Sequence, residues 1–247
     1  MSTTTRSEPE VGKRCFASLA AQSLLEAHGL VDLPSAFVLG ESIVGRHQRR
    51  AQRHEHKEVV SLAVGSPDSR DRLYIKRQSR ISRVLPRWTD LRRGFGWLSS
   101  PMCEWRGLQL LRNAGLHAAE PLGLFWAGRG WSRAAIVTRG VPPVMSLADM
   151  IAEREIDKLT DQQRSSLVAA ISRVIEQFAQ LRLAWRSMKP KHFYPEPITP
   201  HDWRIWLIDC EGVHPTASRH DLEHCREVFF QSLDAAQAGS NVTLDFS

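Results

Sequence analysis

The sequence predicts an α+β protein built from two lobes. Short strand-like runs and one amphipathic helix fill the first half of the chain, and helices dominate after residue 140. One more apolar strand then returns and stops at Asp209. Strands and helices that segregate in this way are typical of α+β folds. We therefore expect a strand-rich lobe over 13–140 and a mainly helical lobe over 141–247, preceded by a disordered segment at 1–12.

Apolar periodicity assigns the elements of the first lobe. Helical spacing over 15–28 and over 102–114 is followed in each case by a glycine, a residue common just past helix ends. The turn-forming residues of 65–71 predict a hairpin, and the polar stretch 77–100 predicts a long loop. Strands are expected at 35–39, 59–64, 73–76, 121–126 and 134–138.

In the second lobe, helices are expected on both sides of a proline-rich loop. The break GVPP at 140–143 opens this lobe, and the loop covers 185–202 with four prolines. A short apolar strand at 203–208 leads to Asp209. The expected helices are 146–155, 161–184 and 220–235.

Composition indicates a soluble protein with reduced thiols. Hydrophobic residues make up 42% of the 247 residues and charged residues 24%, which is ordinary for globular proteins. No run of eighteen apolar residues exists, and the polar N-terminal segment lacks the apolar core of a secretory signal. The four cysteines are scattered. We therefore expect a cytoplasmic protein.

A net charge of +6 raises the question of an anionic partner. The dense basic cluster at 46–57 contains no aromatic residue, whereas single-stranded nucleic acid is bound by basic and aromatic side chains together. Nucleic acid is therefore not the expected partner. A solvated loop is the simpler interpretation, and peripheral contact with the anionic inner face of the inner membrane stays open.

The residues that carry chemistry follow a fixed order along the chain. Lys76 ends an apolar strand, and Glu104 lies near the start of a helix 28 residues later. Asp209 follows a buried strand, where its carboxylate could hold a Mg²⁺ ion, although an aspartate there also caps turns. Kinases use a strand lysine held by a helix glutamate to bind phosphates, and a strand-end aspartate to bind metal. The order is more specific than any of these residues alone.

Several motifs resemble one family of kinases over about residues 59–230. They are YIKRQ, CEWRGLQLLRNAGLHAAEPLGLF, VTRG with SLADMI, KPKHFYP and WLIDCEG. The sequence is similar to the lipopolysaccharide core kinases, the Kdo/heptose kinases of WaaP and InaA type. The resemblance implies a protein-kinase-like fold and ATP- and Mg²⁺-dependent phosphorylation of a sugar in the lipopolysaccharide core or a related glycolipid.

The resemblance also implies roles for individual residues. Lys76 would bind phosphates with Glu104 as its partner, and Thr138 would lie at the nucleotide. Asp209 would bind the metal. His192 stands where protein kinases carry a metal-binding Asn.

Two departures leave the activity open. Ser187 occupies the position of the usual catalytic aspartate, and a serine hydroxyl does not ionise near neutral pH. Lys189 or Lys191 could neutralise the transferred phosphoryl group instead. LGESIVG supplies Gly40 and Gly45 of a phosphate-binding loop, but at an unusually long interval before the strand lysine. A plain turn is the alternative there.

Two other functions compete with the kinase. A catalytically inactive kinase-like scaffold that binds nucleotide or a partner is favoured by the serine at the aspartate position. The pattern HDLEH at 220–224 resembles the zinc motif of inverted metallopeptidases, but such a site needs a third ligand, and only 23 residues follow. We interpret it as a chance match.

Overall fold

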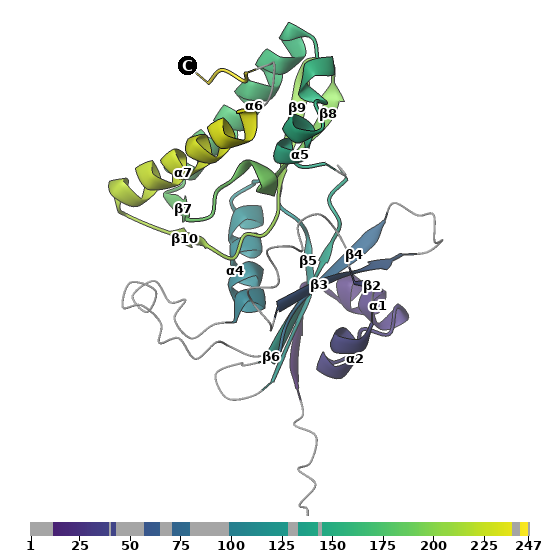
Figure 1. The fold of residues 1–247 in the computed structure, drawn as a ribbon. Helices are drawn as coiled ribbons and strands as arrows, with labels where there is room; N and C mark the ends of the chain where they lie inside the picture. The colour runs from purple at the N-terminus through teal and green to yellow at the C-terminus, as the bar shows by residue number, and fades with distance from the viewer. Residues whose placement is uncertain are drawn as a thin grey trace, which may run out of the picture. The chain divides into compact units, whose positions relative to one another are not determined.

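The computed structural model describes eight stretches of the chain, which form two compact units (Figure 1). The first unit comprises Met1–Met102 and Pro121–Gly140, and the second comprises Cys103–Glu120 and Val141–Ser247. The described residues are 12–39, 41–42, 57–64, 71–79, 99–127, 133–142, 145–238 and 243–246.

An antiparallel sheet of six strands, in the order β1-β5-β6-β4-β3-β2, forms the first unit. In β4, alternate side chains point to opposite faces, so Leu73 and Ile75 lie on one face and Lys76 on the other. The strands are β1 (Lys13–Phe16), β2 (Glu41–Ser42), β3 (Lys57–Ala63), β4 (Arg72–Gln78), β5 (Pro121–Ala127) and β6 (Arg133–Arg139).

Two short helices, α1 (Leu19–Ala27) and α2 (Leu33–Val38), cover one face of this sheet (Figure 1). Leu25 is fully buried and packs in the same cluster as Ile75 and Phe125. Burial of such side chains stabilises the unit by about 1.5–3 kcal/mol each. The face that carries Lys76 is therefore the one left uncovered by α1 and α2.

The N-terminal predictions were wrong in two places. Residues Lys13–Phe16 pair with β5 as a strand, so the helix predicted over 15–28 begins only at Leu19, after the Ser18 cap. The strand predicted at 35–39 is instead helix α2. Asp32 and Ser35 cap its first turn reciprocally, and these capping bonds outweigh the apolar run that suggested a strand.

Helix α4 (Ser100–Asn113) carries Glu104 and matches its predicted span closely. The side-chain oxygen of Gln78 accepts a hydrogen bond from the Ser100 backbone N–H at 2.8 Å. Gln78 lies two residues after Lys76 and so on the same face of the sheet. Gly115 follows the helix with φ +80°, the left-handed conformation expected there.

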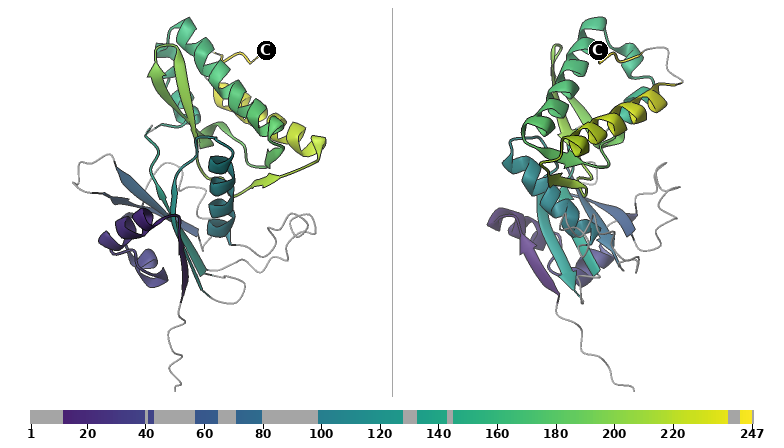
Figure 2. Two further views of the ribbon diagram at one scale, coloured as in Figure 1. Left: turned by 180° about the vertical axis from the view of Figure 1, so that it is seen from behind. Right: turned by 90° about the vertical axis from the view of Figure 1, so that its left-hand side faces the viewer.

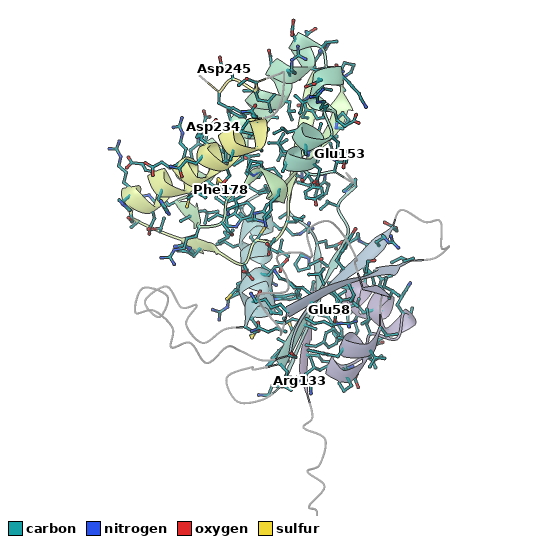
Figure 3. All side chains as sticks on the ribbon, in the orientation of Figure 1. Glu58, Arg133, Glu153, Phe178, Asp234 and Asp245 are labelled. Carbon is teal, nitrogen blue, oxygen red and sulfur yellow. The ribbon has the colours of Figure 1, made fainter. Side chains whose placement is uncertain are left out.

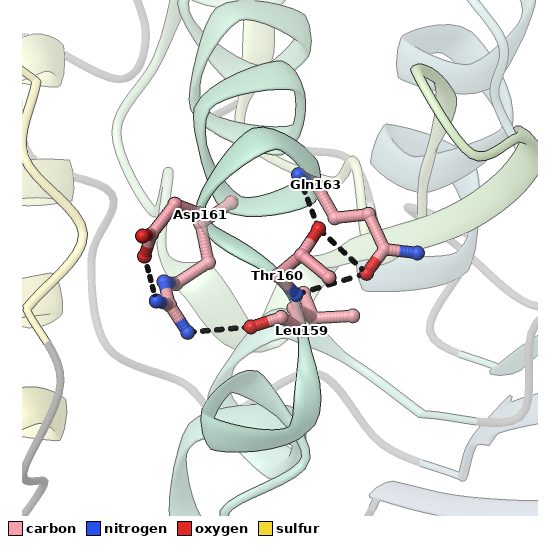
Figure 4. A network of polar contacts seen from close by, with 5 residues as sticks. Leu159, Thr160, Asp161 and Gln163 are labelled. Atoms are coloured by element: carbon pink, nitrogen blue, oxygen red, sulfur yellow. Dashed lines mark hydrogen bonds and ion pairs between the residues drawn. The ribbon is translucent and has the colours of Figure 1, made fainter.

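Helices α5, α6 and α7, the β8–β9 hairpin and the β7–β10 pair lie in the second unit (Figures 1 and 2). Thr160 and Gln163 form a capping box at the start of α6, and Arg164 bonds both the Leu159 carbonyl and Asp161 (Figure 4). The elements are α5 (Leu147–Ala152), α6 (Asp161–Gln180), β7 (Leu183–Trp185), β8 (Phe193–Thr199), β9 (Asp202–Leu207), β10 (Val213–Pro215) and α7 (Arg219–Gln237).

The predicted helix 161–184 and the predicted loop 185–202 both require correction. Helix α6 stops at Gln180, because Arg182 adopts a left-handed φ of +52° and turns the chain into β7. The second half of the predicted loop contains strand β8, which pairs with β9. Its prolines are tolerated because β8 pairs with β9 alone in this sheet, which makes β8 an edge strand. Within the described stretches, no helix is long and apolar enough to cross a membrane.

Candidate functional site

Asp209 lies two residues beyond the last residue of β9, Leu207, and has an unusual backbone. Its φ is +54°, a left-handed conformation that aspartate adopts more readily than most residues. The preceding strand is anchored by Leu207, which is fully buried. The Asp209 side chain, by contrast, is 37% exposed. The sharp turn therefore presents the carboxylate to solvent at the end of a fixed strand.

His192 places its imidazole beside this carboxylate. It ends a short 3₁₀ turn, Pro190–His192, and its side chain is 5% exposed. Nδ1 lies 2.8 Å from the carbonyl oxygen of Ser187, and Nε2 lies 3.4 Å from Asp209 Oδ2. Because a carbonyl only accepts hydrogen bonds, Nδ1 is the donor. The other nitrogen, Nε2, is thereby directed at Asp209.

Trp185 holds the His192 ring from one side. The two rings stack with centroids 5.5 Å apart and planes inclined by 24°. Phe193 and Phe178 (labelled in Figure 3) also stack with Trp185, at 6.0 and 5.9 Å. The Trp185 backbone N–H further contacts the Cys225 sulfur at 3.1 Å. An aromatic core thus fixes both the strand before the loop and the imidazole at its end.

Ser187 lies within the loop and close to the chain that follows Asp209. Strand β7 pairs with β10, with Trp185 opposite Val213. A Cβ atom added to Gly212 would lie 3.6 Å from Ser187 Oγ, in ordinary contact. Ser187 therefore adjoins the segment that follows Asp209. Lys191 is exposed and Lys189 half-buried in the same loop.

Helix α4 is tied to the strand that leads to Asp209. A Cβ atom added to Gly107 would overlap the carbonyl oxygen of Cys210, so only glycine permits this approach. Beyond the helix, Ala119 N–H donates to the Leu207 carbonyl, and Leu207 N–H donates to the His117 carbonyl, each at 2.9 Å. Glu104 lies on this helix and is buried. A buried carboxylate requires a polar or charged partner, and its pairing with Lys76 stays a prediction.

The nucleotide-binding residues suggested by sequence belong to the first unit. Lys76 is half-buried on β4, paired in register with Ile136. Thr138 is buried on β6 opposite Tyr74, which places it on the same sheet face as Lys76. Gly40 and Gly45 lie outside the described residues.

The HDLEH segment lies on α7, where its side chains make ordinary surface contacts. The His220 and His224 rings stack at 6.4 Å, and Glu223 accepts from Arg219 at 2.8 Å. Within the described part of the chain, no group of three or more His, Cys, Asp or Glu side chains is placed to hold a metal ion.

Comparison with known proteins identifies the family. The family model described as "Lipopolysaccharide kinase (Kdo/WaaP) family" matches residues 49–231. The chain belongs to the lipopolysaccharide kinase (Kdo/WaaP) family. A solved structure described as WaaP in complex with acyl carrier protein matches with a TM-score of 0.62 and 14% identity, covering 89% of this chain and 80% of that one. No curated protein matches.

This structural likeness confirms the protein-kinase-like fold that the sequence predicted. Within this Kdo/WaaP kinase family member, the structure brings together His192, Asp209 and the Ser187 carbonyl. Sequence reasoning missed the residues that hold them in place, Trp185 and Gly107. A tryptophan at the end of an apolar run is a weak signal for a core residue, and nothing local marks a helix glycine as a contact point.

Proposed function

We propose that this protein is an ATP- and Mg²⁺-dependent kinase that phosphorylates a sugar of the lipopolysaccharide inner core or a related glycolipid. The observation that carries the proposal is the His192–Asp209 pair at the end of β9, in a chain whose family is defined by such kinases. Phosphoryl transfer depends mainly on positioning and electrostatic stabilisation, and His192 of this pair is held by the Ser187 carbonyl and by Trp185.

The Asp209 carboxylate fits a Mg²⁺ ion. It is an oxygen ligand, the type that Mg²⁺ prefers, and it is exposed enough to be reached. His192 is the second protein group at this position, and its Nε2, which is an acceptor when Nδ1 donates to Ser187, could act as a second metal ligand. The bound ion would neutralise charge on the phosphates. Lys76 would contact the phosphates with Glu104 as its partner, and Thr138, with Gly40 and Gly45, would line the nucleotide.

Ser187 favours a second candidate, a kinase-like scaffold that binds nucleotide without transfer. Serine cannot accept the proton of an acceptor hydroxyl as a carboxylate does.

Two lysines nevertheless favour phosphoryl transfer. Lys189 and Lys191 carry positive charge in the same loop as Ser187 and would stabilise the transferred phosphoryl group without a base. The kinase is the first candidate because Asp209 and His192 lie side by side where a metal ion would be bound.

The deciding experiment measures transfer of the γ-phosphate of radiolabelled ATP to isolated lipopolysaccharide inner core, with Mg²⁺ present. We expect label in the glycolipid with the wild-type protein and none with Asp209→Asn. Retained ATP binding without transfer to any sugar acceptor would support the scaffold. Absence of ATP binding would reject both candidates.

The proposed acceptor sets the expected location. A lipid-linked sugar is reached from a membrane surface, so we propose a cytoplasmic protein that contacts the inner face of the inner membrane peripherally. Basic side chains contribute about 1 kcal/mol each near an anionic surface, so such contact would be reversible. Co-sedimentation with anionic vesicles at low and high salt tests this location.

A further inference from the structure

A cavity of about 290 Å³ lies in the second unit, away from the Asp209 loop. Its walls come from helix α6, from the first residues of β9 and from Gly115–His117, which follow α4. None of the residues assigned above to phosphoryl transfer lines it. The volume lies at the low end of the range of about 300–1,000 Å³ typical of small-molecule sites.

Two arginines from different elements and one carboxylate, that of Asp202, line the cavity, so the arginines outnumber the acid. Arg173, on α6, lies 3.6 Å from Asp202, and Arg204, on β9, lies 3.2 Å from Glu196. A guanidinium carries five N–H donors in a planar fork, and one such contact engages only part of that fork. Donors on both arginines are therefore available to an anion in the cavity.

His117 reports a positive electrostatic environment at the same place. Partial desolvation lowers the pKa of its imidazole below the usual value, and the charges of Arg204 and Arg112 lower it further. Glu196 opposes the shift without reversing it. The ring also lies 5.5 Å from that of Trp206. A neutral imidazole beside two cations can donate a hydrogen bond to an anion.

Apolar side chains form the rest of the lining. Leu116, Trp203 and Ile205 are each less than 8% exposed, so they belong to the core and present fixed surfaces. Gly115 adds no bulk, and a Cβ atom built on it would meet nothing within 4 Å. The cavity therefore combines a cationic, hydrogen-bonding side with an apolar side, as sites for small molecules commonly do.

We propose that this cavity binds a small amphipathic anion. The carboxylate or phosphate of the ligand lies between Arg173 and Arg204 and accepts from His117, and its short apolar body packs against Leu116 and Trp203. This site is separate from the proposed kinase reaction and does not depend on it.

The test uses the full chain without nucleotide and needs no assumption about activity. Hexanoate and hexyl phosphate are titrated while the histidine ring signals are followed by NMR, and acetate, inorganic phosphate and hexanol serve as partial ligands. We expect the two amphipathic anions to bind at least about tenfold more tightly than each partial ligand. Binding of only one of them would identify the head group. The His117 pKa should rise on binding, because an anion favours the charged ring.

Matched variants locate the binding. Arg173→Gln and Arg204→Gln should each weaken binding about five- to tenfold. The control is Arg219→Gln, an exposed and ion-paired arginine on α7, which should leave binding unchanged. The proposal is wrong if hexanol binds as tightly as hexanoate, if neither anion shifts the His117 signals, or if Arg219→Gln weakens binding as much as the cavity variants. The wild-type ligand series decides the matter even if a variant fails to fold.

Discussion

Two histidines flank the end of strand β9, and their surroundings give them different chemistry. Leu207 N–H donates to the His117 carbonyl, and the next N–H along, that of Ile208, donates to the His192 carbonyl. Successive N–H groups of a strand point to opposite sides, so the histidines lie on opposite sides of one strand. The His192 imidazole is buried and stacked on Trp185, whereas the His117 imidazole is exposed and lies near arginines.

The difference teaches that the neighbours of an imidazole decide what it can do. The ring of His192 is fixed on two sides, by the Ser187 carbonyl and by Trp185, so its Nε2 is held in one direction, toward Asp209. The ring of His117 has no such frame and responds instead to nearby charge. We therefore expect changes on the His192 side to affect catalysis and stability, and changes on the His117 side to affect charge-dependent properties.

The largest expected effect comes from the aspartates at the two ends of β9. Asp209→Asn removes the charge at the proposed metal position, and we expect phosphoryl transfer to fall by about 100-fold or more. Asp202→Asn makes the same chemical change at the start of the strand and should leave the rate within about twofold, because this residue is paired with Arg173 away from the loop. Both rates are measured with saturating ATP. Equal losses in the two variants would remove the functional contrast between the strand ends.

Two tryptophans give the corresponding contrast in stability. Trp185→Ala empties the centre of the aromatic stack and should lower the free energy of unfolding by about 3–5 kcal/mol. Trp206 is only partly buried and contacts His117 and Glu196. Its alanine variant should cost about 1 kcal/mol, as most single substitutions do. Urea unfolding followed by circular dichroism measures both. A larger loss of unfolding free energy at Trp206 than at Trp185 would contradict the conclusion that the His192 side of β9 is the more tightly packed one.

Gly107→Ala tests whether α4 is held against the chain after Asp209. Within an ordinary helix, replacing glycine by alanine stabilises by about 0.5–1 kcal/mol. Here the added methyl group overlaps the Cys210 carbonyl, so we expect destabilisation by about 1–3 kcal/mol instead. Chemical denaturation gives the sign directly. A more stable variant would show that the helix can move away from this strand.

Sequence reasoning predicted the fold class, which the structural likeness confirms, whereas the roles of the site residues stay predictions. Two of the corrected assignments, the strand at 35–39 and the loop at 185–202, have local causes: the Asp32–Ser35 capping box and a proline-containing edge strand. Proximity was harder to predict. That His192 meets Asp209 follows from the hairpin register, whereas the cavity near His117 joins three segments far apart in sequence. Neither apolar periodicity nor a local sequence motif indicates that these three segments lie close together.

The smallest expected effect is a pH dependence of stability at His117. Its pKa is lowered in the folded protein, so the unfolded chain binds more protons as pH falls below the usual value of about 6.5. Stability from this residue is complete above that pH and declines as pH falls through the lowered folded pKa. Because the side chain is exposed, the loss should be only a few tenths of a kcal/mol. The difference in unfolding free energy between wild type and His117→Gln, measured at pH 7.5 and 5.5, isolates it from the other histidines. Arg204→Gln should shrink this difference, since it removes one of the charges that lower the pKa; no change in that variant would mean that desolvation alone sets the shift.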